Sequence, residues 1–186
     1  MTAAFTALTA LQARYASKGA ALPPELPEPE YWHGALVGIA GVPLLVPAGD
    51  VDAVIAVPAL TTIPGTRNWV LGIASYHGSL LPVYCGDSLF GQRLPPGRRR
   101  EYCLVIKRPG FHAGITLSRV EGNIKLLMAQ REAECRLDGP LAACCDGGFS
   151  QGERFLGLLD IARLATDAAL LDTAARSVAT AEDTAL

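Results

Sequence analysis

Charge is scarce in the middle of this chain. Of the 186 residues, those at positions 31–92 include only four charged side chains, which are Asp50, Asp52, Arg67 and Asp87. A small β-rich domain exposes about half of its strand positions, so some of the exposed positions here must be apolar or neutral. We therefore expect an uncharged surface that contacts a partner, although the chain's own helices are an alternative cover for it.

The charges that do occur are segregated along the chain. Residues 93–136 carry ten Arg and Lys against four acidic residues, whereas residues 137–186 carry three Arg against eight acidic residues. The net charge of -2 gives no overall preference for nucleic acid. The basic residues of 98–108 are interleaved with a single aromatic residue, Tyr102, so nucleic-acid binding is only an alternative function. We expect Arg93–Arg100 to be a solvated loop.

Disulfide, metal and membrane patterns are also missing. The cysteines, at positions 85, 103, 135, 144 and 145, include no Cys-x-x-Cys pair. An odd count without such a pair argues against a secreted disulfide framework and against a zinc site. Residues 35–49 are uncharged but too short and too rich in Gly and Pro to cross a membrane. With no signal-peptide pattern at the start, we expect a cytoplasmic protein with reduced thiols, no bound metal and no direct membrane insertion.

No motif for catalysis or for a cofactor is present. Gly34, Gly38 and Gly41 lack the spacing of a dinucleotide fingerprint, and no phosphate-binding loop occurs. A cysteine nucleophile needs a histidine base nearby, and the best such combination is His77 with Cys85, on or near the arms of one predicted hairpin. No local pattern supports that pair, so we expect a non-enzymatic protein without catalytic residues or a cofactor.

Apolar periodicity and proline content divide the chain into three parts. Phe5, Leu8 and Tyr15 recur at helical spacing, which predicts an amphipathic helix over residues 3–18. We expect it to pack on its own domain, with a partner as the alternative. Four prolines in residues 22–30 predict an extended linker. The expected parts are a helix and linker at 1–30, a compact domain at 31–166, and a C-terminal helix and tail at 167–186.

Short apolar runs separated by Gly and Pro predict a mainly β domain. The expected strands are 35–40, 43–47, 51–57, 60–63, 73–76, 79–84, 102–107, 112–117, a strand within 120–127, 141–145 and 154–159. They are too many for one five-stranded barrel and suit two. Residues 68–71 are expected to form a helical turn, Asp146-Gly147-Gly148 a turn, and Asp87, Asp160 and Asp167 to cap short helical segments.

The most specific pattern lies in residues 63–83. A Pro64-Gly65 turn precedes Trp69 and Gly72, and two β-type runs then flank His77-Gly78. We interpret Trp69 as a core anchor and Gly72 as a point of close backbone approach. Pro82, in the second run, predicts an edge strand or a bulge, and an edge beside an uncharged face is a natural docking rim.

This order of residues resembles the CheW family, the adaptors that join a chemoreceptor to a histidine kinase. The family's Trp, apolar pair, Gly and Pro-Val are kept. His77 stands where the family has Arg, and Cys85 where it usually has Asp. The resemblance implies two packed SH3-like five-stranded barrels, with an N-terminal helix and short C-terminal helices.

The same resemblance implies the partners. They are a CheA-type histidine kinase and the tip of a methyl-accepting chemoreceptor, joined by a non-enzymatic adaptor. The positions implied in protein interaction are Trp69, Gly72, His77, Gly78, Leu80, Pro82 and Cys85. The flanks, with a proline-rich linker before Trp32-His33-Gly34, are similar to CheW-like proteins that control type IV pili and twitching motility.

The two changed positions alter the expected receptor contact. Histidine keeps a donor but loses the permanent charge and the five N–H groups of arginine. With Cys85 in place of Asp, both members of a possible ion pair are gone, so we expect a weaker or differently specific receptor contact. A scaffold that has lost receptor coupling, and a small β-barrel that binds nucleic acid or another protein, are the alternatives.

Overall fold

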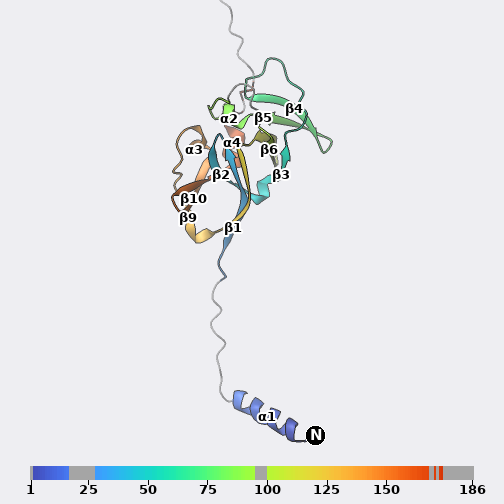
Figure 1. Cartoon of the computed structure of the whole chain (residues 1–186), viewed down its shortest axis with the longest axis vertical. Helices are drawn as coiled ribbons and strands as arrows, with labels where there is room; N and C mark the ends of the chain where they lie inside the picture. The colour runs from blue at the N-terminus through green and yellow to red at the C-terminus, as the bar shows by residue number, and fades with distance from the viewer. Residues whose placement is uncertain (1, 17–27, 95–99, 168–169, 171, 174–186) are drawn as a thin grey trace, which may run out of the picture.

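The computed structural model describes residues 2–16, 28–94, 100–167, 170 and 172–173, and these residues are mainly β (Figure 1). The helices are α1 (Thr2–Ala16), α2 (Gly86–Leu89), α3 (Pro140–Ala143) and α4 (Ile161–Thr166), with short 3-10 turns η1 (Ala48–Asp50) and η2 (Met128–Gln130). The strands are β1 (Tyr31–Ile39), β2 (Val42–Pro47), β3 (Val51–Ala56), β4 (Val70–Tyr76), β5 (Ser79–Tyr84), β6 (Tyr102–Arg108), β7 (Phe111–Thr116), β8 (Arg119–Leu127), β9 (Arg131–Glu132), β10 (Cys145–Gln151) and β11 (Arg154–Leu159).

These strands form two sheets. The six-stranded sheet has the order β8-β1-β2-β11-β10-β9, and the five-stranded sheet has the order β3-β6-β7-β5-β4. Figure 1 shows them occupying different halves of the β-rich part. Most neighbours are antiparallel, but β11 pairs in parallel with β2, and β5 with β7. The expected mainly β fold is confirmed, whereas the pairings among the described residues leave both sheets unclosed, so two closed five-stranded barrels are not seen.

Three apolar clusters explain how the sheets are held together. On β1 and β2, Val37 and Leu44 point into a core shared by both sheets, whereas Leu36 and Leu45 point into a second core within the six-stranded sheet. On β6, Leu104 and Ile106 join the shared core, while Cys103 and Val105 join a third core within the five-stranded sheet. The two faces of a strand alternate from residue to residue, so each of these strands has both faces covered.

This double burial explains much of the scarcity of charge. Residues 35–40 are all buried, and residues 103–106 are completely buried. Strands covered on both faces consist of nearly continuous apolar runs. The uncharged stretch was expected to leave an exposed apolar face, but only a minority of its strand positions are exposed, because the others are buried or partly buried.

Most predicted strands are confirmed, and two are wrong. Residues 60–63 form no strand; Thr61 makes only an isolated bridge to Ile73. Residues 141–145 lie mainly in α3, and the Asp146-Gly147-Gly148 segment is a bulge within β10 rather than a turn. Residues 68–71 hold a turn that leads into β4, not a helical turn.

Pro82 does not mark an edge strand. β5 lies between β4 and β7, so β4 is the edge of the five-stranded sheet. The pairing of β5 with β7 is limited to Val83 and Tyr84, and it begins one residue after Pro82. The missing N–H of proline is therefore tolerated at the point where the second neighbour has not yet joined.

The predicted helix caps are confirmed only in part. Asp160 caps α4 as predicted, because its carboxylate accepts hydrogen bonds from the N–H groups of Ala162 and Arg163 at 2.8 and 3.2 Å. The predicted second helix lies mostly outside the described residues, although Leu170 N–H donates to Asp167 at 3.2 Å. Asp87 is not a cap: α2 begins after Cys85 without a side-chain cap, and Asp87 has a different role described below.

The N-terminal helix is confirmed, but the packing expected for it is not found. Phe5, Leu8, Leu11 and Tyr15 on α1 are all more than half exposed. The linker predicted at 22–30 falls largely outside the described residues, and only residues 28–30 are seen, without regular structure. None of the helices described is long and apolar enough to cross a membrane.

Candidate interaction surface

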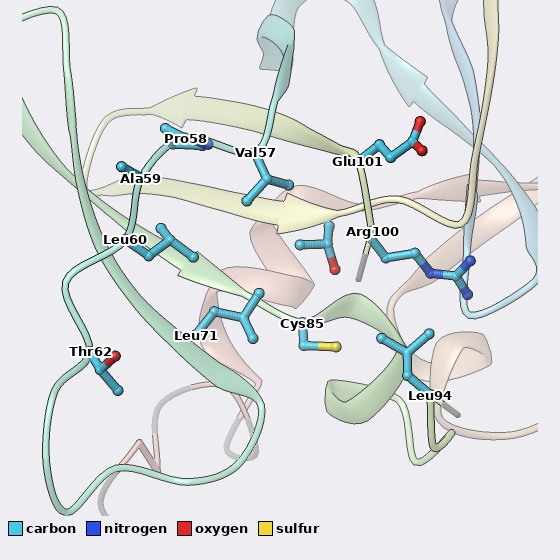
Figure 2. Close-up of a pocket in the computed structure, with 11 residues that line it drawn as sticks. Val57, Pro58, Ala59, Leu60, Thr62, Leu71, Cys85, Leu94, Arg100 and Glu101 are labelled. Carbon is cyan, nitrogen blue, oxygen red and sulfur yellow. The ribbon is translucent and has the colours of Figure 1, made fainter. Parts of the chain in front are cut away.

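An apolar groove lies between the loop after β3 and the start of α2, with a volume of about 660 Å³ (Figure 2). Figure 2 shows the side chains of Val57, Leu60 and Leu71 pointing into the space beside Cys85. The groove is lined by Val57, Pro58, Ala59, Leu60, Thr62, Leu71, Cys85, Leu94, Arg100, Glu101 and Thr116. The lining is mostly apolar with a charged end, which suits the apolar side chains of a partner protein.

The wall formed by the loop is fixed to β4 by its backbone. Thr61 and Ile73 exchange two hydrogen bonds, each 2.9 Å long. Gly72, which directly precedes Ile73 on β4, has a φ of +142°, and a Cβ there would lie 2.4 Å from the carbonyl oxygen of Thr61. The predicted close approach at Gly72 is therefore confirmed, and it is what lets the loop lie against β4 and shape the groove.

The charged end of the groove is an ion pair. Asp87 is 2% exposed, and its carboxylate accepts two hydrogen bonds from Arg100, at 2.9 Å from Nε and 2.5 Å from a terminal nitrogen. These hydrogen bonds raise the pKa of the Arg100 guanidinium above its ordinary value. The pair joins α2 to the segment just before β6, and so fixes one side of the groove.

A second apolar region adjoins the groove on the outer face of the β4–β5 hairpin. We call it the hairpin face; it consists of Ile73 and Ser75 on β4 and their cross-strand partners Pro82 and Leu80 on β5. Leu80 is 72% exposed, which is unusual for so large an apolar side chain. No residue of Val70–Tyr84 is charged, so this face presents an exposed, uncharged contact area of the kind predicted.

The residues singled out from the sequence are spread over four places: the groove wall, the hairpin face, the core and the hairpin tip. Cys85 lies in the groove wall, whereas Leu80 and Pro82 lie on the hairpin face. Trp69 is 7% exposed and its ring packs edge-on against Tyr84 with centroids 5.6 Å apart, as expected of a core anchor. Gly72 supports the groove from beneath. Their roles in protein interaction stay predictions.

His77 and Gly78 form the two-residue tip of the hairpin. Their φ angles are +46° and +77°, as a type I′ turn requires. The imidazole ring of His77 packs against Tyr76 with ring centroids 4.2 Å apart. Because Cys85 follows the other end of β5, the structure separates His77 from Cys85, and the one candidate nucleophile and base are not neighbours.

The thiols show no sign of activation. All five cysteines are free, including the adjacent Cys144 and Cys145. Burial raises the pKa of Cys103 and of Cys144 to about 11, and that of Cys145 to about 12. A cysteine nucleophile needs a lowered pKa, so these side chains are suited to packing. Within the described residues, no cluster of His, Cys, Asp and Glu could hold a metal ion.

The basic segment that suggested nucleic-acid binding is partly neutralised. Arg100 is paired with Asp87, and Arg108 lies 3.1 Å from Asp50. Residues 95–99 fall outside the described residues. The remaining described basic residue of the segment is Lys107, which is too little for the charged stripe that a nucleic-acid surface needs.

Sequence reasoning missed the loop residues Pro58–Leu60, Leu94 and the Asp87–Arg100 pair. One signal was available for the pair, because Asp87 is one of only four charges in residues 31–92. A charge kept within an apolar stretch is often a buried, paired group. No local signal could have placed Arg100 beside it.

The chain is similar to known proteins in both sequence and fold. A model of the CheW-like domain matches residues 33–169. Over 118 residues, or 63% of this chain, the sequence is 30% identical to Protein PilI of Pseudomonas aeruginosa, and the match spans 66% of that protein, just under two thirds. The fold is similar to the crystal structure of the scaffolding protein TtCheW from Thermoanaerobacter tengcongensis, with a TM-score of 0.61, 18% identity, and coverage of 70% of this chain and 89% of that one.

Proposed function

Because the chain belongs to the CheW-like family, we propose that it is a non-enzymatic scaffold that couples a chemoreceptor to a CheA-type histidine kinase. The observation that carries this proposal is the family match over residues 33–169, and the similarity first seen in residues 63–83 is thereby confirmed. The 30% identity to PilI supports a place in a chemosensory system that controls type IV pili and twitching motility, at the cytoplasmic side of a receptor array.

The proposed mechanism is thermodynamic coupling rather than chemistry. A scaffold that binds receptor and kinase together transmits a signal only if its contacts differ between the two states of the receptor. Coupling of this kind is typically 1–3 kcal/mol, and it is reciprocal: kinase binding changes receptor affinity by the same factor. Two rigid sheets with a shared core are suited to this role, because a displacement at one surface is carried to the other.

We assign the two contact areas separately. The groove accepts apolar side chains of the receptor's helical hairpin, because it is concave and mostly apolar. The hairpin face takes the regulatory domain of the kinase, because it is exposed, uncharged and lies on the edge strand β4. Leu80 is the expected central contact of that second area.

Direct binding measurements test both assignments. The full chain is titrated by calorimetry with a receptor-tip fragment and, separately, with the kinase regulatory domain. Ala59→Arg is expected to block the groove and weaken receptor binding by about tenfold, while Leu80→Arg weakens kinase binding by a similar factor. Val120→Arg, at another exposed apolar position on β8, is the matched control and is expected to leave both affinities unchanged.

Two outcomes would contradict the proposal. If the wild-type chain bound neither partner but bound DNA or RNA with a steep dependence on salt, the nucleic-acid alternative would replace it. If both partners bound but neither Ala59→Arg nor Leu80→Arg changed an affinity, the scaffold function would stand and the assigned surfaces would be wrong.

A further inference from the structure

A second hollow, of about 400 Å³, opens on the side of the five-stranded sheet where the tip of the β4–β5 hairpin meets β3, β6 and β7. Unlike the groove, it is lined mostly by polar side chains. They are Asp52 of β3, Tyr76 and His77 at the hairpin tip, Ser79 of β5, Lys107 of β6 and His112 of β7. Five segments of the chain thus bring polar groups together in one place.

The carboxylate in the hollow already has a hydrogen-bond partner, whereas the ammonium group has none among the described residues. The hydroxyl of Tyr76 donates to Asp52 at 2.9 Å, so the carboxylate already has a partner. The next residue after Lys107, Arg108, is held by Asp50 at 3.1 Å. The ammonium group of Lys107, in contrast, has neither an ion pair nor a hydrogen bond to any residue in the described part of the chain.

The histidines also have unused hydrogen-bonding capacity. Nε2 of His112 is buried and has no hydrogen-bond partner, which is rare for a buried polar atom. His77 is held at the tip with its backbone in the left-handed conformation, so its ring stays beside the hollow. The second torsion of a histidine side chain is broad, so the ring of His112 can turn its nitrogen toward the hollow that it lines.

We propose that this hollow binds one carboxylate of an acidic segment of a partner protein, with Lys107 as the ion pair and His112 and His77 as hydrogen-bond donors. A neutral imidazole still has one N–H to donate, so the ring need not be charged. The carboxylate of Asp52 already lines the hollow, so the ligand is expected to bring only one further negative charge. A phosphate dianion fits less well, because no guanidinium lines the hollow and no helix begins there.

The position of the hollow favours a protein ligand over a free anion. Leu80, 72% exposed, follows directly after Ser79 in the same hairpin. Successive side chains of a strand point to opposite faces, so Leu80 and the hollow lie on opposite faces of the same hairpin end. Only a ligand as long as a protein segment can pass around the tip and contact both. The inference does not depend on the proposed function, because it requires only an acidic segment and not a particular receptor or kinase.

The test is an NMR titration of the isotopically labelled full chain with a hexaglutamate peptide. We expect saturable shifts in the side-chain signals of Lys107, His77 and His112, and a loss of affinity of about fivefold in Lys107→Met. Lys125→Met is the matched control, because Lys125 lies on β8, 3.7 Å above the ring of Tyr31, and far along the chain from the hollow. His77→Asn keeps a residue that tolerates the turn and isolates the imidazole.

Each outcome decides for or against the inference. Shifts confined to the hollow and lost in Lys107→Met support it. Equal weakening by Lys125→Met would show non-specific attraction to basic side chains, and tighter binding of inorganic phosphate than of the peptide would show a phosphate site; either result overturns it. Unchanged folding of Lys107→Met, checked by its backbone spectrum, excludes loss of structure as the cause. Failure of this test leaves binding of receptor and kinase unaffected, so it is distinguishable from failure of the proposed function.

Discussion

At the scale of single residues, the Asp87–Arg100 pair is the most informative contact. A buried carboxylate is costly unless a partner satisfies it. Here Arg100 makes two hydrogen bonds to Asp87 in a part of the chain with almost no other charge. The pair fixes α2 against the start of β6, so it determines the shape of the groove as well as its charged end.

Removal of one member should therefore destabilise the fold. Asp87→Asn is expected to lower the free energy of unfolding by about 2–3 kcal/mol, somewhat less than for a fully buried pair because Arg100 keeps 20% of its side chain exposed. Unfolding in urea, followed by circular dichroism, measures the change.

Two comparisons sharpen that measurement. Arg136→Gln removes a partner of Glu132 in an ion pair whose arginine is 65% exposed, and should change stability by less than about 1 kcal/mol. The double variant Asp87→Leu with Arg100→Met should be less destabilised than Asp87→Asn, because no unpaired charge is left. An equal loss of unfolding free energy in Asp87→Asn and Arg136→Gln would show that the buried pair stabilises the fold no more than the exposed pair does.

The structural role of a residue could be predicted where that role follows from the residue type alone. Trp69 was predicted as a core anchor and Gly72 as a site of close approach, because a large ring and a missing Cβ have few other uses in a short strand. Asp87 was predicted as a helix cap, and this was wrong. A carboxylate near a short helix suits either role, and the choice depends on Arg100, thirteen residues away.

At the scale of elements, the β4–β5 hairpin combines two glycines with positive φ and different surroundings. A Cβ at Gly72 would lie 2.4 Å from a backbone oxygen, whereas a Cβ at Gly78 would meet nothing within 4 Å. The two positions therefore separate backbone strain from steric overlap within one element.

We expect Gly72→Ala to be the more damaging substitution. Gly78→Ala should cost about 1–2 kcal/mol, the usual cost of a left-handed conformation for a residue with a Cβ. Gly72→Ala should cost more than about 3 kcal/mol, because the loop from β3 must also move away from β4. Chemical denaturation of the two variants measures both losses of unfolding free energy. Equal losses would contradict the close contact between Gly72 and the loop that forms the groove wall.

Element prediction succeeded where the pairing is local. The hairpins β1–β2, β4–β5 and β6–β7 follow from two strands and a turn that contains Gly, all visible within a short window. The position of β5 was wrong because its second neighbour, β7, is far away in the sequence and pairs in parallel. Leu60 packs against the third core, and Leu141, Cys144 and Cys145 belong to the shared core. Apolar content alone does not distinguish a strand from a packed loop or helix.

At the scale of the whole molecule, the apolar cores link stability to pH through their thiols. Cys103, Cys144 and Cys145 have a pKa raised by burial from 9.0 to about 11, 11 and 12. Below pH 9.0 the thiols are protonated in both the folded and the unfolded chain, so their stabilising contribution is fully present. Above it the unfolded chain ionises first, so this contribution is lost as pH rises toward the folded pKa.

Stability should therefore fall between about pH 9 and about pH 11, by at most about 2 kcal/mol per thiol. Urea unfolding midpoints across this range measure the loss. The variant Cys103→Ala with Cys144→Ala and Cys145→Ala is the control: its curve should be flatter than that of the wild type, whatever its stability at neutral pH. Parallel curves for the two proteins would contradict the assignment of the loss to these thiols.

The two sheets also differ in when they can form during synthesis. The five-stranded sheet uses β3–β7, which are consecutive in the chain, whereas β1 and β2 of the six-stranded sheet have β8 and β11 as outer neighbours. Gly157, which pairs with Leu44, leaves the ribosome about 110 residues later, a delay on the order of 10 s at usual rates of translation. Until β8 emerges, the nascent β1–β2 hairpin presents two unpaired apolar edges, and the edge of β2 stays unpaired for the whole interval. Nascent chains that emerge close together on one messenger are therefore at greatest risk of pairing wrongly there.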